Sequence, residues 1–176
     1  WNNGAAPSVA NSYFTTNYVL RSPANANAYT FGGSALSIDQ YGLAGNVGGR
    51  LLLKGSGGGV ITVTNLILNS GLLDYANAGD TRIETLAGNV LLNNGATSYM
   101  GALSGPGYFE TLIVVAPIGG GGSLQIGGNN VNAGADYGVV EMNAANTYSG
   151  ATTVSTGTLL VNGSIGSGSV TINTNA

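Results

Sequence analysis

Short clusters of apolar residues follow one another from about residue 35 to the end of the chain. Gly, Asn, Ser or Asp separates each cluster from the next, and apolar and polar side chains alternate in stretches such as residues 60–64 and 170–172. This alternation is typical of half-buried strands, and no stretch shows a convincing helical period. The pattern therefore predicts many short strands. The clusters are Leu36 with Ile38, Leu51–Leu53, Val60–Val63, Leu66–Leu68, Leu91–Leu92, Leu112–Val115, Leu124 with Ile126, Val139–Val140, Leu159–Val161, and Val170 with Ile172.

The composition supports an all-β chain. Of the 176 residues, 31 are glycine, 6% are charged, and none is cysteine or histidine. Soluble domains usually carry about 25% charged residues, so helices rich in salt bridges are not expected. Hydrophobic residues still form 43% of the chain, which is too many for a disordered Gly/Ser linker. Two architectures fit these strands equally well: a sandwich of antiparallel strands, or a solenoid whose coils each add a few short strands.

The last segment, Asn146–Ala176, carries a specific pattern. An Asn-Thr-Tyr-x-Gly step begins it, followed by a Thr-Thr-Val strand, a Gly-Thr-Leu-x-Val strand, and a Gly/Ser turn into another Val-rich strand. This order closely resembles the autotransporter-associated β-strand repeat of bacterial passenger domains and large surface proteins. Residues 31–36 and 64–71 are similar to the irregular region that precedes such repeats, and the first 28 residues have no clear match.

The resemblance implies a right-handed parallel β-helix that a bacterium secretes or displays on its cell surface. We expect this β-helix over residues 29–176, with the recognisable repeat at 146–176. In such coils the inward side chains of successive strands stack at about 4.8 Å. The chain stops soon after a strand with no evident cap, which we interpret as a mature segment or a fragment of a longer product. The candidates for the inward stacks are Val154, Leu159, Val161, Val170 and Ile172.

The segment 1–28 is expected to be irregular and is rich in aromatic residues. The ends of a solenoid present unpaired backbone groups that invite further pairing. In one interpretation this segment caps the first coil or fills a groove along it. In the other, Ser12–Leu20 is an extended strand that pairs with another subunit and gives a head-to-tail fibre. The candidates for subunit pairing are Trp1, Tyr13, Phe14 and Tyr18.

Little in the sequence points to catalysis. Without His and Cys, the Ser-His-Asp and Cys-His arrangements and ordinary zinc sites are excluded. We therefore expect no enzyme activity and no cofactor. Asp74, Asn77 and Asp80 superficially resemble a calcium loop, but their spacing is not that of an EF-hand. We interpret them as a solvated turn, with calcium binding as the alternative; a lyase or hydrolase using Asp74 and Glu84 is a distant third function.

The expected partners follow from charge and hydropathy. Four basic residues cannot form the dense basic face that nucleic acids require. No apolar run approaches the roughly 20 residues of a membrane span, so no membrane insertion is expected. The leading hypothesis is a structural, extracellular β-solenoid that self-associates into a fibre or surface layer. The alternative is an adhesin or carbohydrate-binding module in which Tyr99, Tyr108 and Tyr137 stack on glycans.

Overall fold

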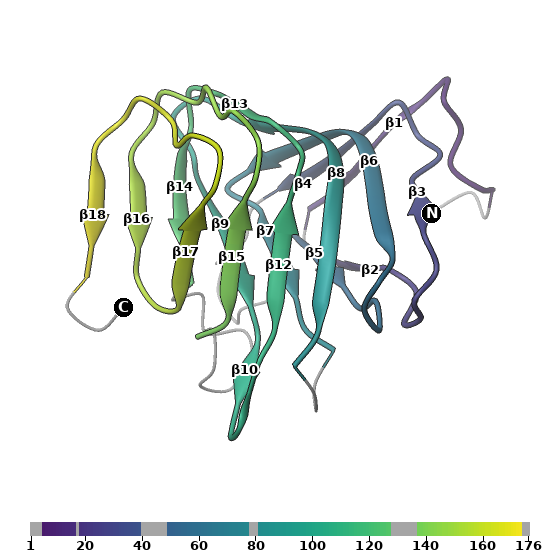
Figure 1. Cartoon of the computed structure of the whole chain (residues 1–176). Helices are drawn as coiled ribbons and strands as arrows, with labels where there is room; N and C mark the ends of the chain where they lie inside the picture. Colours follow the sequence, from purple (N-terminus) through teal and green to yellow (C-terminus); the bar gives the residue numbers. More distant parts are fainter. Residues whose placement is uncertain (1–4, 17, 40–48, 78–80, 128–136, 174–176) are drawn as a thin grey trace.

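The computed structural model describes residues 5–16, 18–39, 49–77, 81–127 and 137–173. Within these ranges the chain forms strands and turns, and it contains no helix that could cross a membrane. The described strands form a nine-stranded parallel sheet, called sheet A here, a seven-stranded parallel sheet, called sheet B, and one antiparallel hairpin. Figure 1 shows the strands stacked side by side from the purple N-terminal end to the yellow C-terminal end.

Sheet A has the order β1-β4-β6-β8-β12-β15-β17, with β3 beside β6 and β13 beside β8. Every pairing in it is parallel. Its strands are β1 (Ser12–Thr15), β3 (Tyr29–Thr30), β4 (Ala35–Asp39), β6 (Val60–Asn69), β8 (Ile83–Leu92), β12 (Thr111–Val114), β13 (Ile118–Gly120), β15 (Val139–Met142) and β17 (Thr158–Val161).

Sheet B has the order β18-β16-β14-β9-β7-β5-β2 and is also parallel. Its strands are β2 (Val19–Arg21), β5 (Arg50–Leu53), β7 (Leu72–Tyr75), β9 (Thr97–Ala102), β14 (Ser123–Ile126), β16 (Thr152–Val154) and β18 (Val170–Ile172). The hairpin consists of β10 (Ser104–Gly105) and β11 (Tyr108–Phe109).

The chain alternates between the two sheets, and each visit adds one strand, or two consecutive strands at β3–β4 and β12–β13, beside the strands of the previous coil. This winding confirms the parallel β-helix that the sequence predicts and excludes the antiparallel sandwich. Because side chains alternate between the faces of a strand, every second side chain points between the sheets. These inward positions form the main hydrophobic core, which extends from Leu36 to Val154.

The inward side chains are arranged in columns, because parallel strands in register place each residue next to its counterpart in the neighbouring coil. One column in sheet B runs through Leu20, Leu51, Leu73, Met100, Ile126, Val154 and Ile172. One column in sheet A runs through Tyr29, Ile61, Leu86, Val114, Met142 and Val161. Burying one large apolar side chain contributes roughly 1.5–3 kcal/mol, so these columns replace the core of a globular domain.

Sheet A bends along a line that crosses its two longest strands. The register between β6 and β8 shifts between Val63 and Leu66, at the polar residues that separate two apolar clusters in the sequence. Gly88 lies at this bend with φ of 109°, and a Cβ there would overlap the carbonyl oxygen of Val63. Only glycine adopts this conformation without strain. The two clusters thus form one bent ten-residue strand instead of two separate strands.

Residues 146–173 form the last coils, and polar side chains in this segment hold neighbouring coils together. Asn146 is buried, and its Oδ1 accepts a hydrogen bond from the Ile118 amide at 2.9 Å while its Nδ2 donates to the Ser164 carbonyl at 2.6 Å. Tyr148 is fully buried, and its hydroxyl lies 2.6 Å from Oγ1 of Thr152. The Asn-x-Tyr step therefore satisfies buried polar groups at a turn of the solenoid.

Replacing Tyr148 by phenylalanine is expected to lower the free energy of unfolding by about 1–2 kcal/mol. The change keeps the ring but removes the hydrogen bond and leaves the buried Thr152 hydroxyl without this partner. Urea denaturation followed by circular dichroism measures the difference. The matched control is Tyr137→Phe, at a tyrosine that is 48% exposed, and an equal loss in both variants would contradict the expectation.

The N-terminal segment is part of the solenoid and is more regular than expected. Ser12–Thr15 pairs with β4, and Val19–Arg21 pairs with β5, so both build the first coil. Tyr13 is half-buried and packs edge-on against Phe31, with ring centroids 5.6 Å apart. Phe14, at an outward position of β1, is 72% exposed, and Tyr18 is 73% exposed. Trp1 lies outside the described residues.

Candidate functional site: the two ends of the solenoid

At the C-terminal end, the inward columns reach the surface. Val161 and Ile172 are paired in register with Met142 and Val154, which are 0% and 6% exposed, yet they are 38% and 70% exposed themselves. Val170 is 51% exposed in the same way. These side chains point to the core side of their strands, but no further coil of the described chain covers them. The sequence identified them as inward residues, and the structure shows that their burial is incomplete.

The outer edges of the last coil are open as well. Among the described strands, β17 pairs only with β15 and β18 only with β16. Each edge therefore presents backbone N–H and C=O groups on one side, which is a template for another parallel strand.

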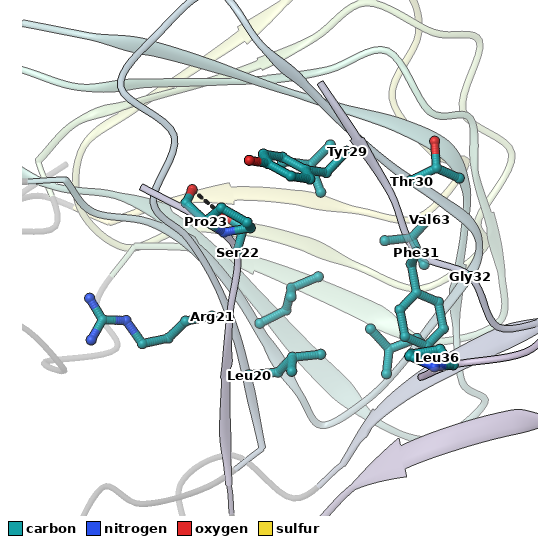
Figure 2. Close-up of a pocket in the computed structure, with 13 residues that line it drawn as sticks. Leu20, Arg21, Ser22, Pro23, Tyr29, Thr30, Phe31, Gly32, Leu36 and Val63 are labelled. Atoms are coloured by element: carbon teal, nitrogen blue, oxygen red, sulfur yellow. Dashed lines mark hydrogen bonds between the residues drawn. The ribbon is translucent and has the colours of Figure 1, made fainter. Parts of the chain in front are cut away.

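At the N-terminal end, the space between the sheets opens into a cavity of about 240 Å³. Figure 2 shows Leu20, Tyr29, Phe31 and Leu36 around it. Tyr29 is held in place by Asn25, whose Nδ2 lies 2.7 Å from the tyrosine hydroxyl. The other lining residues are Pro7, Arg21, Ser22, Pro23, Thr30, Gly32, Leu51, Ile61 and Val63. The cavity is mostly apolar because it is the first section of the core between the sheets.

Strands β2 and β3 border this cavity and also have open outer edges. In the described part of the chain, β2 pairs only with β5 and β3 only with β6. The two ends of the solenoid are therefore related: one exposes apolar side chains beside open parallel edges, and the other exposes an apolar cavity beside open parallel edges.

The calcium candidates are arranged differently from the solvated turn that the sequence suggested. Asp74 lies within β7, is 0% exposed, and forms an ion pair with the buried Arg50 of β5. Both side chains belong to the outer face of sheet B, where Leu52 and Tyr108 also pack. Asp74 is thus a structural residue within a strand, and the expected solvated turn at this position is wrong.

Asn77 follows β7 and contributes to a network of partly buried polar groups around the buried Glu110. Its backbone amide donates to both carboxylate oxygens of Glu110, at 3.0 and 3.1 Å, and its Nδ2 donates to the Gly55 carbonyl at 2.8 Å. Lys54 donates to the carbonyl of Ala76 in the same region. Burial, followed by repulsion from Arg21, lowers the pKa of Lys54. These contacts connect successive coils along one edge of the solenoid.

The described residues contain no group of three or more acidic, His or Cys side chains positioned to hold a metal ion. Asp80, the third calcium candidate, lies outside the described residues. In the described part of the segment, Asp74 forms an ion pair with Arg50, and the Asn77 side chain donates a hydrogen bond to the Gly55 carbonyl. The local geometry therefore gives calcium binding no support beyond the sequence pattern.

Glu84 has an environment that the sequence did not indicate. It lies in β8, where it is the counterpart of the inward residue Leu112, and it is 1% exposed. Both carboxylate oxygens are buried without a hydrogen-bond partner in the described residues. A Cβ at Gly55 would overlap this carboxylate, so the glycine makes room for it. Burial raises the pKa of Glu84 to about 7.

The tyrosines considered for glycan binding do not gather on one surface feature. Tyr99 is half-buried in sheet B, Tyr108 packs over Leu52, and Tyr137 is 48% exposed. A second cavity, of about 570 Å³, lies on sheet A, and its lining includes Ile67, Leu91, Gly119 and Thr147 but no aromatic residue. No stacking platform for sugars is formed by these three tyrosines together.

Comparison with protein-family models, with curated proteins and with solved structures finds no match for this chain. The class of protein that the fold defines is a parallel β-solenoid, and this statement rests on the strand pairing alone. The resemblance of residues 146–176 to the autotransporter-associated repeat remains a prediction from the sequence.

Proposed function

We propose that this chain is a structural β-solenoid that assembles head to tail, so that the last coil of one copy is followed by the first coil of the next. The observation that carries the proposal is the exposure of Val161, Val170 and Ile172. Their counterparts in the preceding coil, Met142, Thr152 and Val154, are all buried. Exposed apolar patches mark interaction sites, and open strand edges are templates for pairing with another chain.

The assembly has a defined direction. Both sheets are parallel, so the C-terminal edges and the N-terminal edges of two copies differ in their residues but have the same strand direction. Such a contact is heterologous and does not close by two-fold symmetry. Repeating it extends the solenoid along its axis, which gives a filament.

The free energy gained when two copies associate is large enough to offset the cost of association. Covering one large apolar side chain contributes roughly 1.5–3 kcal/mol, and two open edges acquire backbone hydrogen bonds at the same time. Association costs several kcal/mol of translational and rotational freedom. Several covered side chains together with two strand pairings offset this cost, so assembly is expected to depend strongly on protein concentration.

The wider setting of the proposal is a bacterial extracellular surface, where the protein acts as a fibre or surface layer without enzymatic activity. The repeat-like sequence of residues 146–176 and the absence of His and Cys support this setting. The low charge also supports it, because 6% charged residues leave little repulsion between stacked copies.

The test is negative-stain electron microscopy across a concentration series, together with sedimentation velocity. The wild-type chain is expected to form filaments, and Ile172→Lys is expected to abolish them because it places a charge in the contact. The matched control is Thr171→Lys, which puts the same charge on the same strand at the outward position, and its filaments are expected to persist.

The monomers of both variants are expected to melt at nearly the wild-type temperature, because Ile172 is 70% exposed in the single chain. Wild-type protein that stays monomeric at high concentration would overturn the proposal. A glycan array would then be the next experiment, since the adhesin hypothesis does not require assembly.

A further inference from the structure

We propose that the N-terminal cavity is the receptor for two side chains of a second copy: Ile172 seats over Leu20, and Val161 seats over Tyr29. This inference rests on the proposed head-to-tail assembly and specifies its register. It makes the cavity the start of a core that continues from one copy into the next (Figure 2).

The column in sheet B gives the first half of the register. Ile172 is its last member and Leu20 its first, and all the members between them are buried apolar residues in unbroken register. A copy that adds its first coil at the normal spacing of parallel strands, about 4.8 Å, would place Leu20 directly over Ile172. The strands that meet are β18 and β2, which are both three residues long.

The column in sheet A gives the second half independently. Its first member is Tyr29 in β3, and its last is Val161 in β17. The strand that continues β17 is therefore β3, and not β1. The first strand, β1, is the outermost strand of the other half of the bent sheet. It pairs with β4, and β4 pairs with the second half of β6.

In the proposed contact, the segment of the last coil that lies opposite β1 is the chain after β17. At the C-terminal end, the Ser167 amide donates to the Tyr148 carbonyl at 2.9 Å, and the Thr147 amide donates to the Ile118 carbonyl of β13 at 2.8 Å. Residues 164–167 form no strand of their own, but their backbone bonds to Ala144 and Tyr148 place them in the last coil on the side of the solenoid where β1 lies in the first. The sides of the last coil that correspond to sheet B and to both halves of the bent sheet A thus each have a counterpart in the first coil.

The chemistry of the two surfaces also agrees. The cavity is lined mainly by Leu, Ile, Val, Pro and aromatic side chains, which favours an apolar occupant. The opposite end offers β-branched side chains that stack well on residues of similar shape. A charged or strongly polar occupant would leave its groups without hydrogen-bond partners between the sheets.

Cysteine cross-linking tests the register, since the chain has no native cysteine. Cα atoms of directly paired residues on neighbouring parallel strands lie about 4.8 Å apart, within the range that a disulfide bridges. Under mild oxidation, the variant Leu20→Cys/Ile172→Cys is expected to give a ladder of covalent oligomers on a non-reducing gel. The control Leu20→Cys/Thr171→Cys, shifted by one residue to the opposite face, is expected to give none.

A second pair makes the test independent of Leu20. Tyr29→Cys/Val161→Cys is expected to give the same ladder, and Tyr29→Cys/Leu160→Cys is the shifted control. Reduced samples are examined in parallel by electron microscopy. If the shifted controls form filaments and both matched variants stay monomeric, the loss is due to replacing Ile172 and Val161. That result would still support a contact at these two positions.

The failures of the two proposals are distinguishable. Filaments that form without a ladder in either matched variant, or with a ladder in the shifted controls, would overturn the register while leaving the head-to-tail assembly intact. A wild-type chain that forms no filaments would overturn both. A cavity that still binds an apolar fluorescent dye in mature wild-type filaments would also contradict its occupation by a second copy.

Discussion

Replacing Arg50 by methionine is expected to lower the free energy of unfolding by about 3–5 kcal/mol, because it leaves the charge of Asp74 buried without the ion pair. Arg50 is 7% exposed and Asp74 is 0% exposed, so water cannot compensate at the surface of the folded chain. The measurement is chemical denaturation of dilute monomer at neutral pH, where the carboxylate is ionised in the unfolded state.

The double variant Arg50→Met/Asp74→Leu separates the lost charge pair from lost packing. Since no buried charge remains in it, it is expected to regain part of the stability that the single variant loses. Arg21→Met, which removes an exposed arginine from neighbouring strand β2, serves as the control and is expected to change stability by less than about 1 kcal/mol. A single variant no less stable than this control would show that the ion pair is unimportant.

The second large effect concerns the pH dependence of stability, which Glu84→Gln is expected to change. Burial raises the pKa of Glu84 from 4.5 to about 7, so the folded chain holds this proton more tightly than the unfolded chain. The resulting stabilisation is fully present below about pH 4.5 and is lost as the pH rises through 7. One pKa unit corresponds to about 1.4 kcal/mol, so the total change is about 3 kcal/mol.

The readout is the difference in unfolding free energy between wild type and Glu84→Gln, measured from pH 5 to pH 8. Between pH 5 and pH 8 this difference is expected to move in favour of the variant by about 2.5 kcal/mol, because glutamine stays neutral and part of the total change lies below pH 5. Taking the difference removes the contributions of the other carboxylates. Glu141→Gln, at the outward position of β15, is the control for the loss of an acidic residue from the same sheet. A difference that does not vary with pH would contradict the buried, unpaired state of Glu84.

Much of the candidate site could be anticipated at the C-terminal end and little of it at the N-terminal end. Val161, Val170 and Ile172 were recognisable as inward residues because the repeat pattern is local and regular. Leu20 and Tyr29 gave no such signal, because their role depends on strands far along the chain that pair with them. Phe14 and Tyr18, two of the aromatic candidates for subunit pairing, are exposed at the first coil, and their part in such pairing stays a prediction.

The charged residues show the same limit of sequence patterns. Asp74 and Glu84 stood out as an acidic cluster, and polar residues next to glycine and asparagine usually form solvated turns. The structure separates them: Asp74 faces Arg50 on the outer face of sheet B, and Glu84 lies between the sheets beside Gly55. Which partner each carboxylate meets is decided by the stacking of coils and not by neighbours in the sequence.

The amino-acid sequence is sufficient to predict an all-β chain of short strands, and its repeat-like end favours a parallel solenoid. Alternation with period two decides which side chains share a face, and this is a local property. The register of each coil on the next, the bend through Gly88, and the environments of Glu84 and Ile172 depend on how distant segments pack, and they are seen only in the folded chain. The physical reason is that burial in a solenoid depends on the coils above and below a residue, so the same inward valine or isoleucine is core in the middle of the stack and exposed at its end.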